Sequence, residues 1–109
     1  MDSSQNRRHP RVNVNFYADW GLGPECESYD KVTSLSISGC FLATQRELRV
    51  GESIHIKLPI ETRTLRLKGI VRRQLRIMEG MPPTGVGVEF VGVSGDDERK
   101  LQEVVDQLA

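Results

Sequence analysis

Three arginines near the amino terminus, Arg7, Arg8 and Arg11, are the residues whose type and spacing most directly suggest chemistry. A guanidinium group is planar and donates two parallel hydrogen bonds, so it is well suited to grip a phosphate or the edge of a nucleobase. In extended backbone, Arg7 and Arg11 would stand about 13 Å apart at roughly 3.3 Å per residue. They therefore suit an elongated anion with several acceptors, or a bent chain; a solvated basic tail is the alternative.

A second polar stretch runs from Ser34 to Gly39 and alternates serines with Leu35 and Ile37. Its hydroxyl groups, Ser36 among them, could face a ligand while the two apolar side chains enter the core. The glycine can adopt a positive φ, which would let backbone N–H groups approach an anion closely. The alternative is an ordinary amphipathic strand that ends in a turn.

The charges of the chain balance, with fifteen Lys and Arg against fifteen Asp and Glu, so the net field does not favour duplex DNA. We expect neither DNA nor RNA as a partner. Within residues 62–78, however, six cations occur without an acid: Arg63, Arg66, Lys68, Arg72, Arg73 and Arg76. Arg72 could add a phosphate contact or a stacking face. A solvated or partner-binding surface is the alternative for this segment.

Metal and catalytic motifs are missing from the sequence. Cys26 and Cys40 form no CxxC pair, and neither His9 nor His55 stands at a ligand spacing from them. We expect reduced, half-buried thiols, no metal and no cofactor. The sequence also lacks a GxSxG elbow and a P-loop, which predicts a protein that is not an enzyme.

The elements that must position these residues are short. Alternation of apolar and polar side chains, as from Val12 to Ala18, is typical of half-buried strands. Glycine, proline and serine punctuate six such segments, which favours a β-barrel or a sandwich. The predicted strands cover residues 12–18, 26–33, 40–44, 53–58, 65–72 and 85–91.

Only the carboxyl-terminal segment has helical periodicity. Leu101, Val104, Val105 and Leu108 recur at i, i+3, i+4 and i+7, which places them on one face, and Ser94 is a suitable N-cap. We expect this face to pack on the barrel. The 109 residues fit one domain, which we divide into a basic arm, 1–11, and a barrel with its helix, 12–109.

The sequence contains neither a signal-peptide core at its polar amino end nor an apolar run approaching the roughly 20 residues that span a bilayer. We therefore expect a cytoplasmic protein without membrane insertion. A monomer or weak dimer is expected.

Three motifs together resemble the PilZ domain family. Arg7-Arg8-His9-Pro10-Arg11 resembles the RxxxR arm of that family, and Ser34-Leu35-Ser36-Ile37-Ser38-Gly39 resembles its (D/N)xSxxG motif. Gly85-Val86-Gly87-Val88-Glu89-Phe90 resembles its late barrel strand. Their order and separation, with the basic strand and the terminal helix, cover nearly the whole chain.

The resemblance implies a mostly β fold: a six-stranded antiparallel β-barrel with a C-terminal α-helix. It also implies that the ligand is cyclic di-GMP, held between the arm and the serine motif. Arg7 and Arg11 would grip guanine and phosphate, with Arg8 in the same arm, while Ser36 and Gly39 would line the other side. The implied function is a bacterial effector that changes its surface on binding and regulates a partner in motility, surface polysaccharide production or secretion.

The sequence departs from the family pattern at Ser34, where the motif has Asp or Asn. A hydroxyl offers less acceptor capacity than a carboxylate or an amide, so the substitution bears on ligand affinity more than on fold. The alternative function is therefore a protein-interaction module that binds cyclic di-GMP weakly or not at all. Single-stranded nucleic-acid binding is a third hypothesis, but six aromatic residues supply few stacking surfaces.

Overall fold

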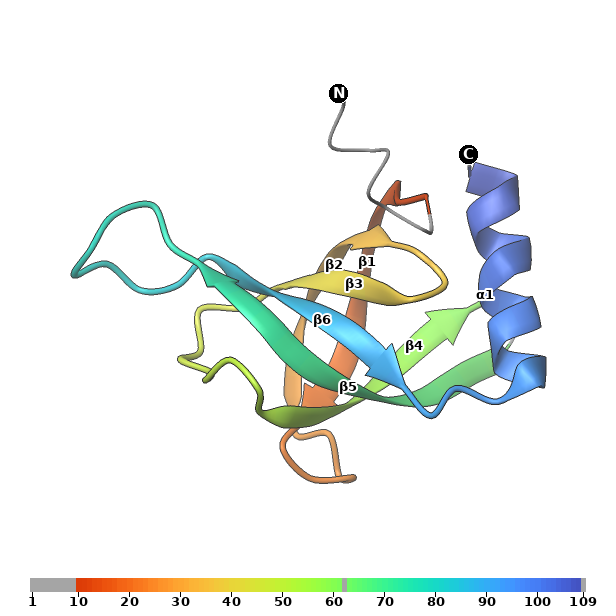
Figure 1. The fold of residues 1–109 in the computed structure, drawn as a ribbon, viewed down its shortest axis with the longest axis horizontal. Coiled ribbons are helices and arrows are strands. Elements are labelled where there is room, and N and C mark those ends of the chain that lie inside the picture. The colour runs from red at the N-terminus through yellow and green to blue at the C-terminus, as the bar shows by residue number, and fades with distance from the viewer. Residues whose placement is uncertain (1–9, 62, 109) are drawn as a thin grey trace.

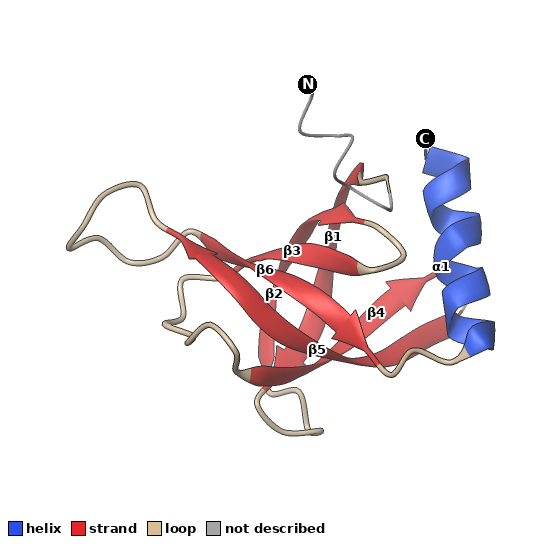
Figure 2. Cartoon of the chain, viewed as in Figure 1, coloured by secondary structure: helices blue, strands red, loops and turns tan. Residues whose placement is uncertain are grey.

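The structure is a computed structural model that describes residues 10–61 and 63–108. Within these ranges the chain forms six strands followed by one helix (Figure 1, Figure 2). The elements are β1 (Val12–Gly21), β2 (Ser28–Leu35), β3 (Gly39–Ala43), β4 (Ser53–Ile60), β5 (Arg63–Leu75), β6 (Gly85–Val91) and α1 (Gly95–Leu108).

The strands close into an antiparallel barrel in the order β1-β2-β3-β6-β5-β4, which confirms the predicted fold. The last strand, β6, lies between β3 and β5. This order matters for function because β3 begins directly after the serine-rich segment and β5 carries the basic one. Both segments are therefore brought to the same strand, although they are far apart in the sequence.

Several strand ends differ from the prediction by one to three residues, and two of these differences have a clear local cause. The second strand begins at Ser28 rather than at Cys26, because Cys26 has a φ of 53° and belongs to the preceding turn. The fifth strand continues to Leu75, well past its predicted end. The pairing of β5 with β6 shifts between Val71 and Arg73, so a bulge lets the strand continue after its simple alternation has ended.

The barrel interior is filled by the apolar side chains of all six strands. Trp20 is fully buried, and its indole Nε1 donates a 2.9 Å hydrogen bond to Asp30 Oδ2. Both cysteines are buried and free, whereas half-buried thiols were expected. Outside the barrel, the rings of Tyr17 and Tyr29 stack with centroids 5.1 Å apart.

The helix α1 begins as its sequence predicts. The Ser94 hydroxyl accepts a 3.1 Å hydrogen bond from the Asp97 N–H, so Ser94 is the N-cap. Leu101 and Val105 are buried with the barrel core, but Leu108, in the last turn of the helix, is 53% exposed. The described residues contain no helix long and apolar enough to cross a membrane.

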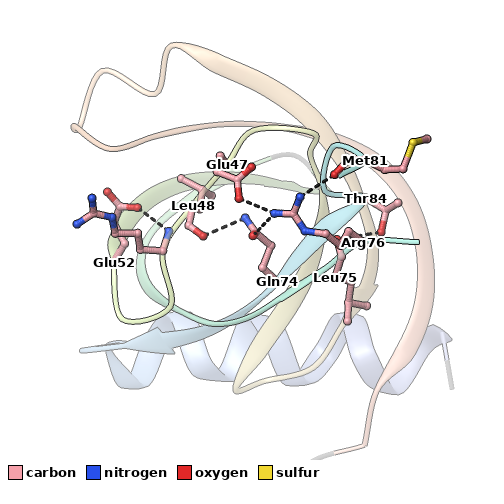
Figure 3. Close-up of polar contacts among 9 residues, drawn as sticks. Glu47, Leu48, Glu52, Gln74, Leu75, Arg76, Met81 and Thr84 are labelled. Atoms are coloured by element: carbon pink, nitrogen blue, oxygen red, sulfur yellow. Dashed lines mark hydrogen bonds and ion pairs between the residues drawn. The ribbon is translucent and has the colours of Figure 1, made fainter. Parts of the chain in front are cut away.

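The hairpin that joins β5 to β6 projects from the barrel and is braced at its base (Figure 1, Figure 3). The Arg76 guanidinium donates to the Met81 carbonyl at 2.6 Å and pairs with the Glu47 carboxylate. Gln74 Nε2 donates a 2.9 Å hydrogen bond to the Leu48 carbonyl. The end of β5 is thereby fixed to the loop before β4 and to the hairpin, which helps to hold the nearby arginines of β5 in place.

Candidate ligand-binding site

The serine turn, residues 36–38, connects β2 to β3 and is organised by Ser36. This residue is only 2% exposed. Its hydroxyl oxygen accepts hydrogen bonds from the N–H groups of Ser38 and Gly39, each at 3.1 Å, and its own N–H donates to the Gly39 carbonyl at 2.8 Å. Ser36 therefore shapes the turn from inside, and direct ligand contact by Ser36 stays a prediction.

Gly39 is required by a close approach of two strands. A Cβ added to Gly39 would lie 2.2 Å from the Val88 carbonyl oxygen, a distance that no side chain tolerates. The expectation that Gly39 uses a positive φ to present its N–H to an anion is wrong: its φ is not positive, and its N–H already donates to Ser36. The Phe90 N–H donates to the Ser38 carbonyl at 2.8 Å, which fixes the turn against β6.

Two consecutive arginines on β5 face outward because of the bulge. Val71 pairs with Val88 and Arg73 pairs with Gly87, which leaves Arg72 as the extra residue. Strict alternation would put one of two successive side chains into the core, but both Arg72 and Arg73 are exposed. The irregularity thus doubles the cationic charge at this point of the surface.

Each of these arginines has a defined neighbour on β6. Arg72 Nε lies 2.6 Å from Glu89 Oε1, with about half of each side chain exposed. Arg73 lies over Gly87, since a Cβ added to this glycine would be 3.0 Å from the Arg73 Cγ. An exposed ion pair contributes little to stability, roughly 0–1 kcal/mol, so Arg72 can exchange Glu89 for another anion at small cost.

Arg11, just before β1, meets the serine turn and the two β5 arginines around one cavity. The cavity has a volume of about 290 Å³. We call it the arginine pocket; its lining residues are Arg11, Ser38, Gly39, Arg72, Arg73, Gly87, Val88 and Glu89. Three guanidinium groups and one hydroxyl from distant parts of the chain can donate hydrogen bonds there, which suits an anion with several acceptors.

Cys40, which follows Gly39 in β3, is buried and has a raised pKa. Burial raises the pKa of Cys40 to about 12, and the nearby charge of Arg11 opposes this shift only in part. A thiol with such a pKa is protonated at neutral pH and is a poor nucleophile. The described residues also contain no group of three or more His, Cys, Asp and Glu that could hold a metal ion. The pocket can bind and orient an anion.

The predicted site residues fall into three groups. The structure brings Arg11, Gly39 and Arg72 together in the pocket. Ser36 supports the turn, and Ser34, which pairs with Asn13 and Phe41 in the described sheet, does not line the cavity. Arg7 and Arg8 lie outside the described residues.

Sequence reasoning missed Ser38, Arg73 and Glu89 as pocket residues. Ser38 was visible as the third serine of the motif, but only the turn geometry shows that it, rather than Ser36, reaches the cavity. Arg73 depends on a bulge that no residue type announces. Glu89 stands on the outer side of β6, where alternation with the buried Val88 and Phe90 could have placed it.

The model of the PilZ domain matches residues 5–107 of this chain. The chain belongs to the PilZ family. The structural relatives of this PilZ chain include the PilZ domain of YcgR from Escherichia coli, in a structure with cyclic di-GMP. That domain shares 18% sequence identity at a TM-score of 0.70, over 95% of this chain and 92% of that one.

Two longer proteins have the same fold in part. The inhibitor of motility MotI (DgrA) from Bacillus subtilis matches at 19% identity and a TM-score of 0.74, over 94% of this chain and 50% of that one. MrkH from K. pneumonia, in a complex with cyclic di-GMP, matches at 18% identity and a TM-score of 0.72, over 94% of this chain and 52% of that one. This chain therefore spans about half the length of these two proteins. A search of curated protein sequences found no match.

Proposed function

We propose that this PilZ chain binds cyclic di-GMP in the arginine pocket and, in the bound form, regulates a partner protein. The observation that carries the proposal is the convergence of Arg11, the serine turn and Arg72 on one cavity. These elements come from the amino end, the β2–β3 connection and β5, so their meeting is a property of the fold and not of the sequence order. Structures of YcgR and MrkH contain the same ligand.

The chemistry of the pocket suits this ligand. The phosphates of cyclic di-GMP offer charged oxygens. Its guanine bases offer the O6 and N7 acceptors, to which the guanidinium group of an arginine binds in a bidentate manner. Arg11 and Arg73 can supply such forks, while Arg72 would leave Glu89 for a phosphate oxygen. The Ser38 hydroxyl adds a neutral donor or acceptor at the edge of the cavity.

The remaining arginines complete the proposed switch. In this proposal residues 1–11 form an arm, separate from the barrel and helix of residues 12–109, and Arg7 and Arg8 close over the bound nucleotide. Ordering a residue costs roughly 1–2 kcal/mol, so charge-assisted hydrogen bonds of roughly 1.5–3 kcal/mol each must offset it. The changed surface would be recognised by a partner in bacterial motility, surface polysaccharide production or secretion. The role is non-catalytic, and we assign it to the cytoplasm.

Isothermal titration calorimetry with cyclic di-GMP tests the proposal. We expect saturable binding to the unmodified chain, weakened at least tenfold in Arg11→Ala and also weakened in Arg7→Ala. The matched control is Arg99→Ala, because Arg99 lies exposed on α1 and, within residues 10–61 and 63–108, forms an ion pair only with Asp96, at 3.3 Å. Equal affinities in all four proteins would contradict the assigned site.

A second candidate function is a protein-interaction module that no longer responds to the nucleotide. The observation that favours it is Ser34, a residue with less acceptor capacity than the Asp or Asn of the motif. On this account Ser34→Asp would create or strengthen cyclic di-GMP binding in the same calorimetric experiment. Tight binding by the unmodified chain would eliminate this candidate.

A further inference from the structure

A second basic surface lies on the outer face of β4 and β5, apart from the arginine pocket. Two cross-strand pairs form it: His55 lies opposite Lys68, and Lys57 lies opposite Arg66. The residues that alternate with them along both strands are buried, so these four side chains point outward. We call these four residues the basic face.

The basic face places two like charges, Lys57 and Arg66, opposite one another, an arrangement that destabilises a sheet. No ion pair found among the described residues involves any of the four side chains. Two acids lie near this cluster: Asp19, which stands in register with Lys57 on β1, and Glu25, whose charge acts with that of Asp19 on the Cys26 thiol. Neither forms an ion pair with Lys57, Arg66 or Lys68 in the described part of the chain, so these cations can turn to an added anion.

A cavity of about 220 Å³ gives the basic face a defined shape. The strand residues Ile56 and Leu67 form its floor, and the loop between β1 and β2 forms a wall. Gly21, which pairs with His55, brings no side chain to this edge of the sheet. The lining residues are Pro24, Cys26, His55, Ile56, Lys57, Arg66, Leu67 and Lys68.

The thiol of Cys26, in the wall of this cavity, carries no negative charge that would repel an anion. Burial raises the pKa of Cys26, and this effect outweighs the opposing influence of Lys57 and Arg66. Cys26 is therefore neutral at physiological pH. Glu25, the neighbouring acid, is exposed and does not line the cavity within the described chain.

We propose that this cavity is a second, separate binding site for a compact phosphate-bearing anion such as a diphosphate group. Opposed residues on antiparallel strands have Cβ atoms about 5 Å apart, and residues two positions along a strand are about 7 Å apart. The three cations Lys57, Arg66 and Lys68, with the His55 imidazole as a hydrogen-bonding group at the fourth corner of such a rectangle, match two linked phosphates. Lysine binds phosphate as a point charge, so the site would recognise charge and size. The walled cavity favours a small group over the flat surface of an acidic protein.

Amide NMR titration with sodium pyrophosphate, at ionic strength held constant with sodium chloride, tests the site. We expect saturable shifts around residues 24–26, 55–57 and 66–68. The double variant Lys57→Ala/Arg66→Ala should weaken the apparent affinity at least tenfold. The control Arg99→Ala/Lys100→Ala removes the same charge from α1 and should leave the affinity within twofold. Non-saturating shifts, or equal affinity in the first double variant, would overturn the proposal.

Two further arms identify the source of the phosphate. Vesicles of phosphatidylcholine that contain a phosphatidylinositol phosphate should sediment the chain in a manner sensitive to Lys57→Ala/Arg66→Ala if the ligand is a lipid headgroup. Pyrophosphate binding without vesicle binding would identify a free phosphate compound. If a polyglutamate peptide binds these residues more tightly than pyrophosphate does, the face is a docking surface for an acidic protein and the small-anion site is refuted. Because the test contains no cyclic di-GMP, its result is independent of the proposed function.

Discussion

The arginine pocket and the basic face lie on the same barrel and share strand β5, but they hold their charges differently. In the pocket, Arg72 is paired with Glu89 and Arg73 lies over Gly87, so guanidinium groups have defined neighbours. On the basic face, no ion pair among the described residues involves Lys57 or Lys68. The arginine pocket therefore has cationic side chains with defined positions, whereas the basic face has several positive charges close together without such partners.

This difference indicates two kinds of recognition. A guanidinium fork with fixed neighbours can distinguish the shape of its acceptor, since its hydrogen bonds have set directions. A lysine ammonium is a flexible, strongly hydrated point charge and distinguishes mainly the charge of the ligand. The pocket should therefore select a nucleotide, and the basic face should accept compact phosphates more generally. The following predictions test this contrast, beginning with the largest expected effect.

Gly39→Ala should disrupt the arginine pocket most strongly. The added Cβ would meet the Val88 carbonyl oxygen at 2.2 Å, and because this atom belongs to the backbone of β6, the strand itself must move. We expect a loss of roughly 3 kcal/mol in the free energy of unfolding, at the upper end of overpacking costs, measured by urea denaturation. The control is Gly95→Ala, whose Cβ would contact nothing within 4 Å. Equal stability of the two variants would show that β3 and β6 can move apart at this point at little cost in free energy.

Arg73→Ala and Lys68→Ala compare the two regions on one strand. Loss of a charge-assisted hydrogen bond costs roughly 1.5–3 kcal/mol, so Arg73→Ala should weaken cyclic di-GMP binding about 10- to 100-fold in calorimetry. Lys68→Ala should change it less than about twofold, because Lys68 lies outside the pocket. Similar losses in both variants would mean that net charge, rather than pocket geometry, controls binding.

Cys40 and Cys26 should contribute differently to the pH dependence of the free energy of unfolding. The Cys40 pKa is raised from 9.0 to about 12 when the chain folds, so above about pH 9 the unfolded chain loses a proton that the native chain retains. Stability should therefore fall as pH rises, by roughly 1 kcal/mol between about pH 8 and pH 10 from this thiol. Cys40→Ala should flatten the decline measured by urea unfolding more than Cys26→Ala does. If stability declines with pH as steeply in Cys40→Ala as in the unmodified chain, the pKa of Cys40 is not raised by folding.

Glu89→Gln should have the smallest effect and the opposite sign. The substitution removes the carboxylate that now occupies Arg72, and an exposed pair is worth about 0–1 kcal/mol. Cyclic di-GMP binding should tighten by up to about fivefold in calorimetry, with almost no change in stability. Weaker binding would show that Glu89 itself contacts the nucleotide.

The barrel was predictable because its information is local. Alternation and turn residues located all six strands, the sixth with both of its ends, and Ser94 marked the start of α1. The site was only partly predictable, since its residues meet through pairing. Ser36 is the more conspicuous motif serine, yet it turns inward to hold the backbone, and Ser38 lines the cavity. Arg73 faces outward because of a bulge, and strict alternation from Val71 would have placed it in the core.

Amide NMR mapping of cyclic di-GMP on the unmodified chain tests the central claim most directly, because it locates the ligand on one of the two basic regions. The account predicts saturable shifts concentrated at Ser38, Gly39, Gly87 and Val88, with little change at Lys57 and Lys68. Shifts concentrated at Lys57 and Lys68 instead, or no saturable shifts at all, would contradict it.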